Sequence, residues 1–103
     1  MTTTLTMALP QELTIYTAGE TRHALAQWIA AAPVDTRTWV LDGHAVAEAD
    51  AAGAQMLMAL VRSAAAAGTG LRVEGASDVL RDACRRLGID VLLGLDQPHA
   101  EHA

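Results

Sequence analysis

The fold is decided by one stretch of the chain, TWVLDGHAVAEADAAG at residues 38–53. Its first four residues are β-branched, aromatic or aliphatic, which is typical of a buried strand that ends at Asp42-Gly43. A loop follows. From Asp50 onward apolar residues recur every three or four positions, which predicts a helix with one buried face and a stop at Gly68. The positions on that face are Gly53, Leu57, Leu60, Val61 and Ala64.

Two residues at the start of this helix have clear local roles. Asp50 is the expected N-cap, because its carboxylate can accept hydrogen bonds from the unpaired amides of the first turn and lies at the positive end of the helix dipole. Gly53 has no side chain, so the backbone of the same turn stays open to a close neighbour or partner. The stretch therefore predicts a strand, a loop, an Asp-x-x-Gly turn and an amphipathic helix, in that order.

The segments before this stretch predict two strands and a helix. Strands are expected at residues 3–8 and 12–16, and the connection between them is so short that they should be antiparallel neighbours. Thr17-Ala18-Gly19-Glu20 has the form of a capping box and should begin a helix that ends near Pro33. The buried face of that helix should consist of Ala24, Leu25, Trp28, Ile29 and Ala32.

The segments after it predict a further β-to-α unit. A strand is expected at residues 71–74, and a helix from residue 78 to 87 should have Ser77 as its N-cap. Repeated strand-to-helix units favour parallel pairing with right-handed crossovers. Residues 91–93 should form a last short helix or strand, and residues 97–103 a frayed, flexible tail.

In their order and spacing, these segments resemble the STAS domain, the fold of anti-sigma factor antagonists. The likeness rests on residues 12–17 as an early strand, on residues 38–53, and on residues 71–89 with their Leu-Gly-Ile ending. It covers most of residues 5–92. It implies an α/β fold with a mixed four- to five-stranded sheet and about four helices packed mainly on one face, as a single domain over residues 1–96.

The resemblance also implies a non-enzymatic, protein-docking function without a cofactor. The partner would be a kinase-like (histidine-kinase-like) anti-sigma factor or a chemotaxis signalling protein. Small members of the family linked to ATP-binding-cassette lipid transporters supply the alternative, an accessory subunit that stabilises the transporter ATPase. By this likeness the partner-binding residues would be Asp42, Gly43, His44, Asp50, Ala51, Ala52, Gly53, Gln55 and Met56.

The phosphoacceptor of the regulated family members is missing from this sequence. In those members a Ser or Thr between the Asp and the Gly accepts phosphate, and the added charge releases the partner. Here the two positions are Ala51 and Ala52. The likeness therefore implies the docking surface without the switch, and a partner would be bound constitutively. Because transporter-linked relatives usually keep a Thr after the Asp, Ala51 counts mildly against the transporter alternative.

A third alternative, a metal-binding or enzymatic domain, rests on the acidic loop. The side chains of Asp42, His44, Glu48 and Asp50 could bind a divalent metal if the loop folded back on itself. Their spacing matches no metal-ligand motif, so this alternative ranks last. Other catalytic candidates are weak: Ser63 should lie on the helix surface, and Cys84 should be a small buried residue on the inward face of its helix.

Composition limits the function further. The chain of 103 residues is 51% apolar, enough for one domain with a modest core. A net charge of −5 and seven basic residues, all arginines, argue against nucleic-acid binding. Their one cluster, Arg81, Arg85 and Arg86, should stabilise a helix end. The lone Cys84 and an N-terminus without a signal or membrane segment favour a cytoplasmic protein.

Overall fold

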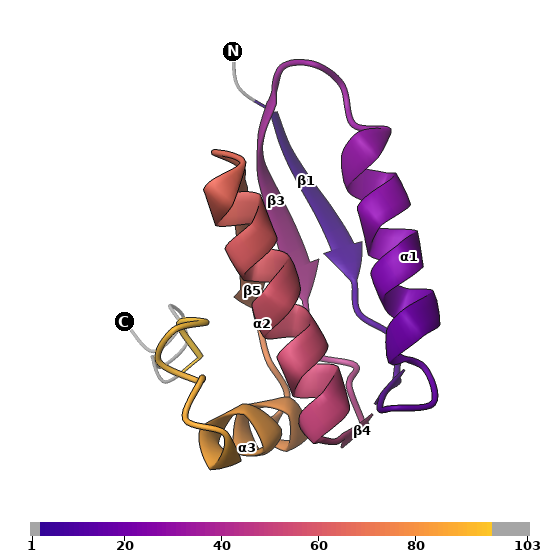
Figure 1. Cartoon of the computed structure of the whole chain (residues 1–103), viewed down its shortest axis with the longest axis vertical. Coiled ribbons are helices and arrows are strands. Elements are labelled where there is room, and N and C mark those ends of the chain that lie inside the picture. Colours follow the sequence, from indigo (N-terminus) through magenta and orange to yellow (C-terminus); the bar gives the residue numbers. More distant parts are fainter. Residues whose placement is uncertain (1–2, 96–103) are drawn as a thin grey trace.

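The computed structural model describes residues 3–95. Three strands, β1 (Thr3–Ala8), β3 (Thr36–Asp42) and β5 (Gly70–Glu74), form one sheet in the order β1-β3-β5, and both pairings are parallel. The strands alternate with helices along the chain, and all three helices are visible in front of or below the sheet in Figure 1. The expected α/β class is therefore confirmed.

A second, two-stranded sheet corrects the expected N-terminal hairpin. β2 (Glu12–Leu13) pairs in parallel with β4 (Glu48–Ala49), and β1 pairs with β3, so the prediction of antiparallel neighbours is wrong. The amide of Leu9 donates to the carbonyl oxygen of Asp42 at 2.8 Å, which extends the pairing of β1 with β3. The carbonyl oxygen of Gln11 then accepts two amides from the segment that enters β4. The chain thus crosses to a second sheet instead of turning back.

The helices cover one face of the larger sheet. α1 (Ala18–Ala30) and α2 (Ala51–Ala66) lie side by side over it, and α3 (Asp78–Arg86) lies across its lower end, in contact with α2 and β4. Residues 3–95 contain three helices, against about four expected. None of the three is both long and apolar enough to span a bilayer.

The core lies between these helices and the sheet. Alternate residues of β3 and β5 point into it, so that Trp39, Leu41, Leu71 and Val73 are buried, while Arg72 and Glu74 of β5 are exposed on the opposite face. α2 buries most of the face expected from its periodicity, and Val61 is half-buried. The buried residues of α2 are Gly53, Ala54, Met56, Leu57, Leu60 and Ala64.

Two local predictions fail near the start of α1. The strand expected at residues 12–16 ends at Leu13, because Thr14 and Thr17 form a hydrogen-bonded turn. Thr17 is the N-cap of α1, but its hydroxyl donates to the carbonyl oxygen of Glu12 and accepts from the amide of Thr14, so the expected capping box does not form. On α1 only Leu25 is fully buried, and Ala24 is exposed.

The C-terminal half agrees more closely with the sequence. Ser77 caps α3 by accepting the amide of Leu80 at 3.1 Å. Gly68 follows α2 with a positive φ of 75°, the left-handed conformation of a helix stop. Residues 90–95 form hydrogen-bonded turns rather than the last helix or strand expected at residues 91–93. The tail expected at residues 97–103 lies outside the described residues.

Candidate functional site

The start of α2 is organised by the carboxylate of Asp50. One oxygen accepts the amide of Gly53 at 3.0 Å, which confirms the expected N-cap. The other oxygen accepts the amide of Ile15 at 3.0 Å, from the turn between β2 and α1. These two hydrogen bonds, the one from Gly53 first, hold the pKa of the Asp50 carboxyl below its usual range. Asp50 therefore fixes the turn at residues 14–17 against the first turn of the helix.

Gly53 has a structural role inside the fold. A Cβ placed on it would lie 1.9 Å from the carbonyl oxygen of Leu13. That oxygen is itself held by the amide of Asp50 at 3.2 Å. The close neighbour that the sequence indicated is therefore β2 of the same chain. Gly53 is buried, so the expected contact of this residue with a partner protein does not fit the structure.

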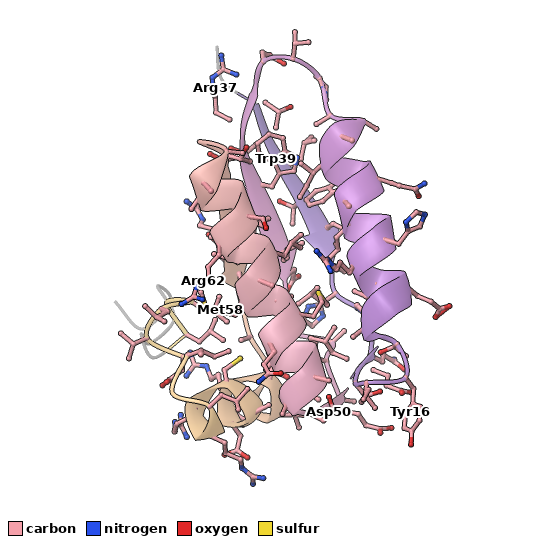
Figure 2. The ribbon with its side chains drawn as sticks, viewed as in Figure 1. Tyr16, Arg37, Trp39, Asp50, Met58 and Arg62 are labelled. Atoms are coloured by element: carbon pink, nitrogen blue, oxygen red, sulfur yellow. The ribbon has the colours of Figure 1, made fainter. Side chains whose placement is uncertain are left out.

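The turn next to Asp50 presents two large apolar side chains that the sequence analysis placed inside a strand. Ile15 is 66% exposed and Tyr16 is 87% exposed. The hydroxyl of Thr14 accepts the amide of Tyr16 at 3.2 Å and donates to the carboxylate of Glu12 at 2.7 Å, which holds the turn in this conformation. Figure 2 shows Tyr16 and Asp50 at the same end of the molecule.

The first turns of α2 add small, uncharged residues to this surface. Ala51 and Gln55 are exposed and Ala52 is half-exposed. These three residues form one surface with Ile15 and Tyr16, which is called the docking surface below. Its only hydroxyl is the phenol of Tyr16, and the two positions at which the regulated STAS proteins carry Ser or Thr are alanines.

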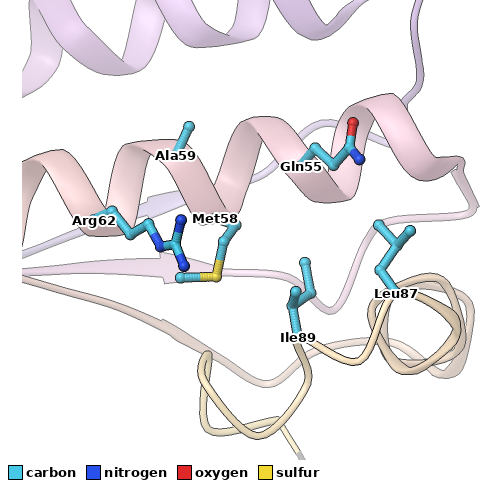
Figure 3. A pocket seen from close by; sticks show the side chains of 6 residues that line it. All are labelled: Gln55, Met58, Ala59, Arg62, Leu87 and Ile89. Carbon is cyan, nitrogen blue, oxygen red and sulfur yellow. The ribbon is translucent and has the colours of Figure 1, made fainter.

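A shallow hollow continues the surface along α2. Its volume is about 290 Å³, and Figure 3 shows its lining side chains, which come from α2 and from the segment that follows α3. Gln55 belongs both to the docking surface and to the hollow, so the two are continuous. The sequence analysis did not identify this hollow, because it depends on how α3 packs against α2. Its lining residues are Gln55, Met58, Ala59, Arg62, Leu87 and Ile89.

Asp42 and His44 form a separate pair at the end of β3. A carboxylate oxygen of Asp42 accepts the backbone amide of His44 and lies 3.0 Å from its ring Nδ1. The amide first, and then the ring, lower the pKa of Asp42. In residues 3–95 no three His, Cys, Asp or Glu side chains are grouped so that they could hold a metal ion. The geometry needed by the metal-binding alternative is not present there.

Two further residues of the expected partner surface are buried. Met56 is 7% exposed and belongs to the core. Gly43 is buried against α3, where an added Cβ would lie 2.8 Å from Cδ2 of Leu80. Its carbonyl oxygen accepts the amide of Ser77 at 3.1 Å. Gly43 therefore fixes the loop to α3 and offers no surface to a partner.

The remaining reactive groups have structural roles. Cys84 is fully buried, and burial, helped by the negative charge of Asp90, raises the pKa of its thiol to about 11. The hydroxyl of Ser77 donates to the carbonyl oxygen of Val46 at 2.7 Å. Arg86 forms an ion pair with Asp82 at 2.9 Å on the surface of α3, in keeping with the helix-stabilising role expected for the arginine cluster.

The fold is that of a small α/β module whose parallel sheet is covered by helices on one face. The chain belongs to the STAS domain family: the family model described as "Mlab, STAS domain" matches residues 2–94. STAS domains are in general protein-interaction modules without catalytic activity. A comparison with curated proteins found no match.

Solved structures show the same fold. A sulfate transporter family protein from Wolinella succinogenes superposes with a TM-score of 0.69 and 23% identity, over 88% of this chain and 71% of that chain. The STAS domain of a SulP transporter from Vibrio cholerae superposes with a TM-score of 0.68 and 20% identity, over 97% of this chain and 77% of that chain. At these identities the comparison shows the fold alone.

Proposed function

We propose that this chain is a non-enzymatic docking module that binds a protein partner constitutively through the docking surface. The observation that carries the proposal is the exposure of Ile15 and Tyr16 beside the capped start of α2. Large aromatic side chains that protrude next to small residues are typical anchors of protein interfaces. A catalytic site, in contrast, would need polar groups converging in a pocket.

The hydrogen bonds beneath the surface support the same proposal. Asp50 holds the turn at residues 14–17 to α2, and Thr14 and Thr17 hold the turn itself. A surface that is ordered before binding loses less conformational entropy when the partner arrives, and so binds more tightly for the same contacts.

Regulation by phosphate at the usual position does not fit this chain. A phosphate there would place about two negative charges within the docking surface, next to the carboxylate of Asp50. Ala51 and Ala52 have no oxygen that could carry it. Binding would then be controlled by the amounts of the two proteins.

For the partner we propose the ATPase subunit of a transporter, of the ATP-binding-cassette lipid type. One observation favours it over the kinase-like anti-sigma factor or chemotaxis protein: the matching family model is the Mlab type of STAS domain, the type of the small lipid-transport-linked members. The anti-sigma partner remains the second candidate, because the Asp-x-x-Gly turn is also that of the anti-sigma factor antagonists. Either partner would place the chain in the cytoplasm.

The test is affinity purification of the tagged protein from cell lysate, with mass spectrometry to identify the bound protein. Wild type is compared with Ala52→Glu and Tyr16→Ala, which alter the docking surface, and with Ala66→Glu, a matched charge change on an exposed residue at the far end of α2. We expect wild type and Ala66→Glu to retain a transporter ATPase and the other two variants to lose it. Retention by all four folded proteins would show that the partner binds elsewhere, and recovery of a kinase-like protein with the same pattern would select the second candidate.

A further inference from the structure

Within residues 3–95, no strand pairs with the outer edge of β1. In the order β1-β3-β5, β1 has one neighbour, β3, and the register between them is regular from Thr4 opposite Thr38 to Ala8 opposite Asp42. The backbone N–H and C=O groups of residues 4–8 that are not directed toward β3 therefore point to this free edge. Such an edge is a template for pairing with another strand.

The edge of β1 has no charged side chain and no proline, two of the features that usually prevent such pairing. Natural edge strands are protected by charged side chains, proline or a bulge. The sequence of β1, TTLTMA, contains neither a charge nor a proline, and its register shift lies at its first residues, Thr3 and Thr4. The opposite edge strand, β5, carries an exposed ion pair between Arg72 and Glu74 at 2.6 Å. Of the two edges of the larger sheet in the described residues, the β1 edge is therefore the one without charged side chains.

The side chains of β1 suit a strand of the same sequence. Thr4, Thr6 and Ala8 are exposed on the uncovered face of the sheet, and Leu5 and Met7 are only half-buried on the face covered by the helices. A neighbouring strand would need apolar residues opposite Leu5 and Met7, and small or hydroxyl-bearing residues opposite the other three. β1 itself offers this pattern.

α1 provides an independent observation on the same side of the molecule. Figure 1 shows α1 on the side of β1 and α2 on the side of β5. Several alanines of α1 are exposed, so that a second helix could approach its backbone closely. A dimer formed through β1 would bring two copies of α1 near each other on the covered face of the sheet. These exposed alanines are Ala24, Ala26 and Ala30, and the C-cap residue Ala31 is exposed as well.

We propose that two copies of this chain form a symmetric dimer by antiparallel pairing of their β1 strands, which joins the two sheets into one of six strands. Side chains that lie directly opposite each other in an antiparallel pair point to the same face of the sheet. The twofold axis must therefore pass through a residue and not between two residues. An axis at Thr6 places Leu5 opposite the partner's Met7 and Thr4 opposite the partner's Ala8. An axis at Leu5 would instead place Met7 opposite the partner's Thr3, at the register shift.

The dimer does not depend on the proposed docking function. No residue of the docking surface belongs to β1 or α1. Each dimer would carry two docking surfaces, and contacts through β1 or α1 would cover neither of them.

Sedimentation equilibrium of the full chain tests the proposal through Thr6. Wild type should sediment with twice the mass of one 10.8 kDa chain. Thr6→Lys or Thr6→Glu alone would place two like charges opposite each other on the axis and raise the dimer dissociation constant about tenfold or more at low salt. An equal mixture of the two variants should recover the dimer as a heterodimer. The matched controls are Ser63→Lys and Ser63→Glu, at an exposed position on α2, and both should dimerise like wild type.

Three results would overturn the proposal. These are a wild type that is monomeric at its highest soluble concentration, a dimer that both Thr6 variants leave intact, and an assembly that grows beyond two chains. Circular dichroism checks that each variant is folded. If a Thr6 variant fails to fold, Thr4→Lys mixed with Ala8→Glu tests the same register, since these exposed residues lie opposite each other across the axis.

Discussion

Replacing Gly53 by alanine should destabilise the fold strongly, although the same change in an open helix is favourable. Alanine exceeds glycine in helix propensity by about 1 kcal/mol. Against this gain, the new methyl group would lie 1.9 Å from the carbonyl oxygen of Leu13, so β2 or α2 must move by more than about 1 Å. Such overpacking costs about 3 kcal/mol. The net loss is then about 2 kcal/mol, or a fall in Tm of about 10 °C for a domain of this size.

Urea unfolding followed by circular dichroism measures this effect, and Gly19→Ala is the matched control. Gly19 lies in the first turn of α1, and a Cβ added to it meets nothing within 4 Å. That variant should gain up to about 1 kcal/mol, the same propensity difference without the clash. Opposite signs for the same substitution at two helix starts would support the role given to the Gly53 contact with β2. Equal or greater stability of Gly53→Ala would refute it.

Two other groups give testable predictions. Because its hydrogen bonds lower the folded-state pKa of Asp50 from the ordinary 3.8, its stabilising effect is complete above that pH and disappears as the pH falls through the lower folded value. Urea unfolding at several pH values should therefore show an advantage of wild type over Asp50→Asn at neutral pH that shrinks below about pH 4, and a constant difference would contradict this. The thiol of Cys84, buried and with a pKa of about 11, should react with a thiol reagent only after unfolding; rapid reaction of the folded protein would show that the helix opens locally.

The parts of the fold that depend on local signals could be predicted from the sequence. Asp50 and Gly68 delimit α2, and Ser77 begins α3, because capping requires only residues within one helical turn. The pairing of β1 could not be predicted in this way. It depends on whether the chain after Leu9 turns back or crosses to the segment before α2, and that choice is made by contacts distant in sequence.

The candidate site could be predicted only in part, because local signals mark the start of α2 but not the turn at residues 14–17. The position of the start of α2 was correct, but Ile15 and Tyr16 were missed, because an alternating apolar run is also typical of a strand. The hydroxyls of Thr14 and Thr17 turn the chain there, and no periodicity indicates those hydrogen bonds. Met56 lies on a helix that is apolar on most sides, so its burial could not be separated from that of Met58.

The two fixed residues of the Asp-x-x-Gly turn both serve the architecture of this chain. Asp50 joins the β2–α1 turn to α2, and Gly53 lets β2 pass against the helix. Neither task involves the two residues between them, which are therefore free to differ without loss of the fold. An Asp-x-x-Gly turn in a sequence therefore indicates how two parts of the chain pack against each other. Whether the protein responds to a kinase depends on the two residues between the Asp and the Gly alone.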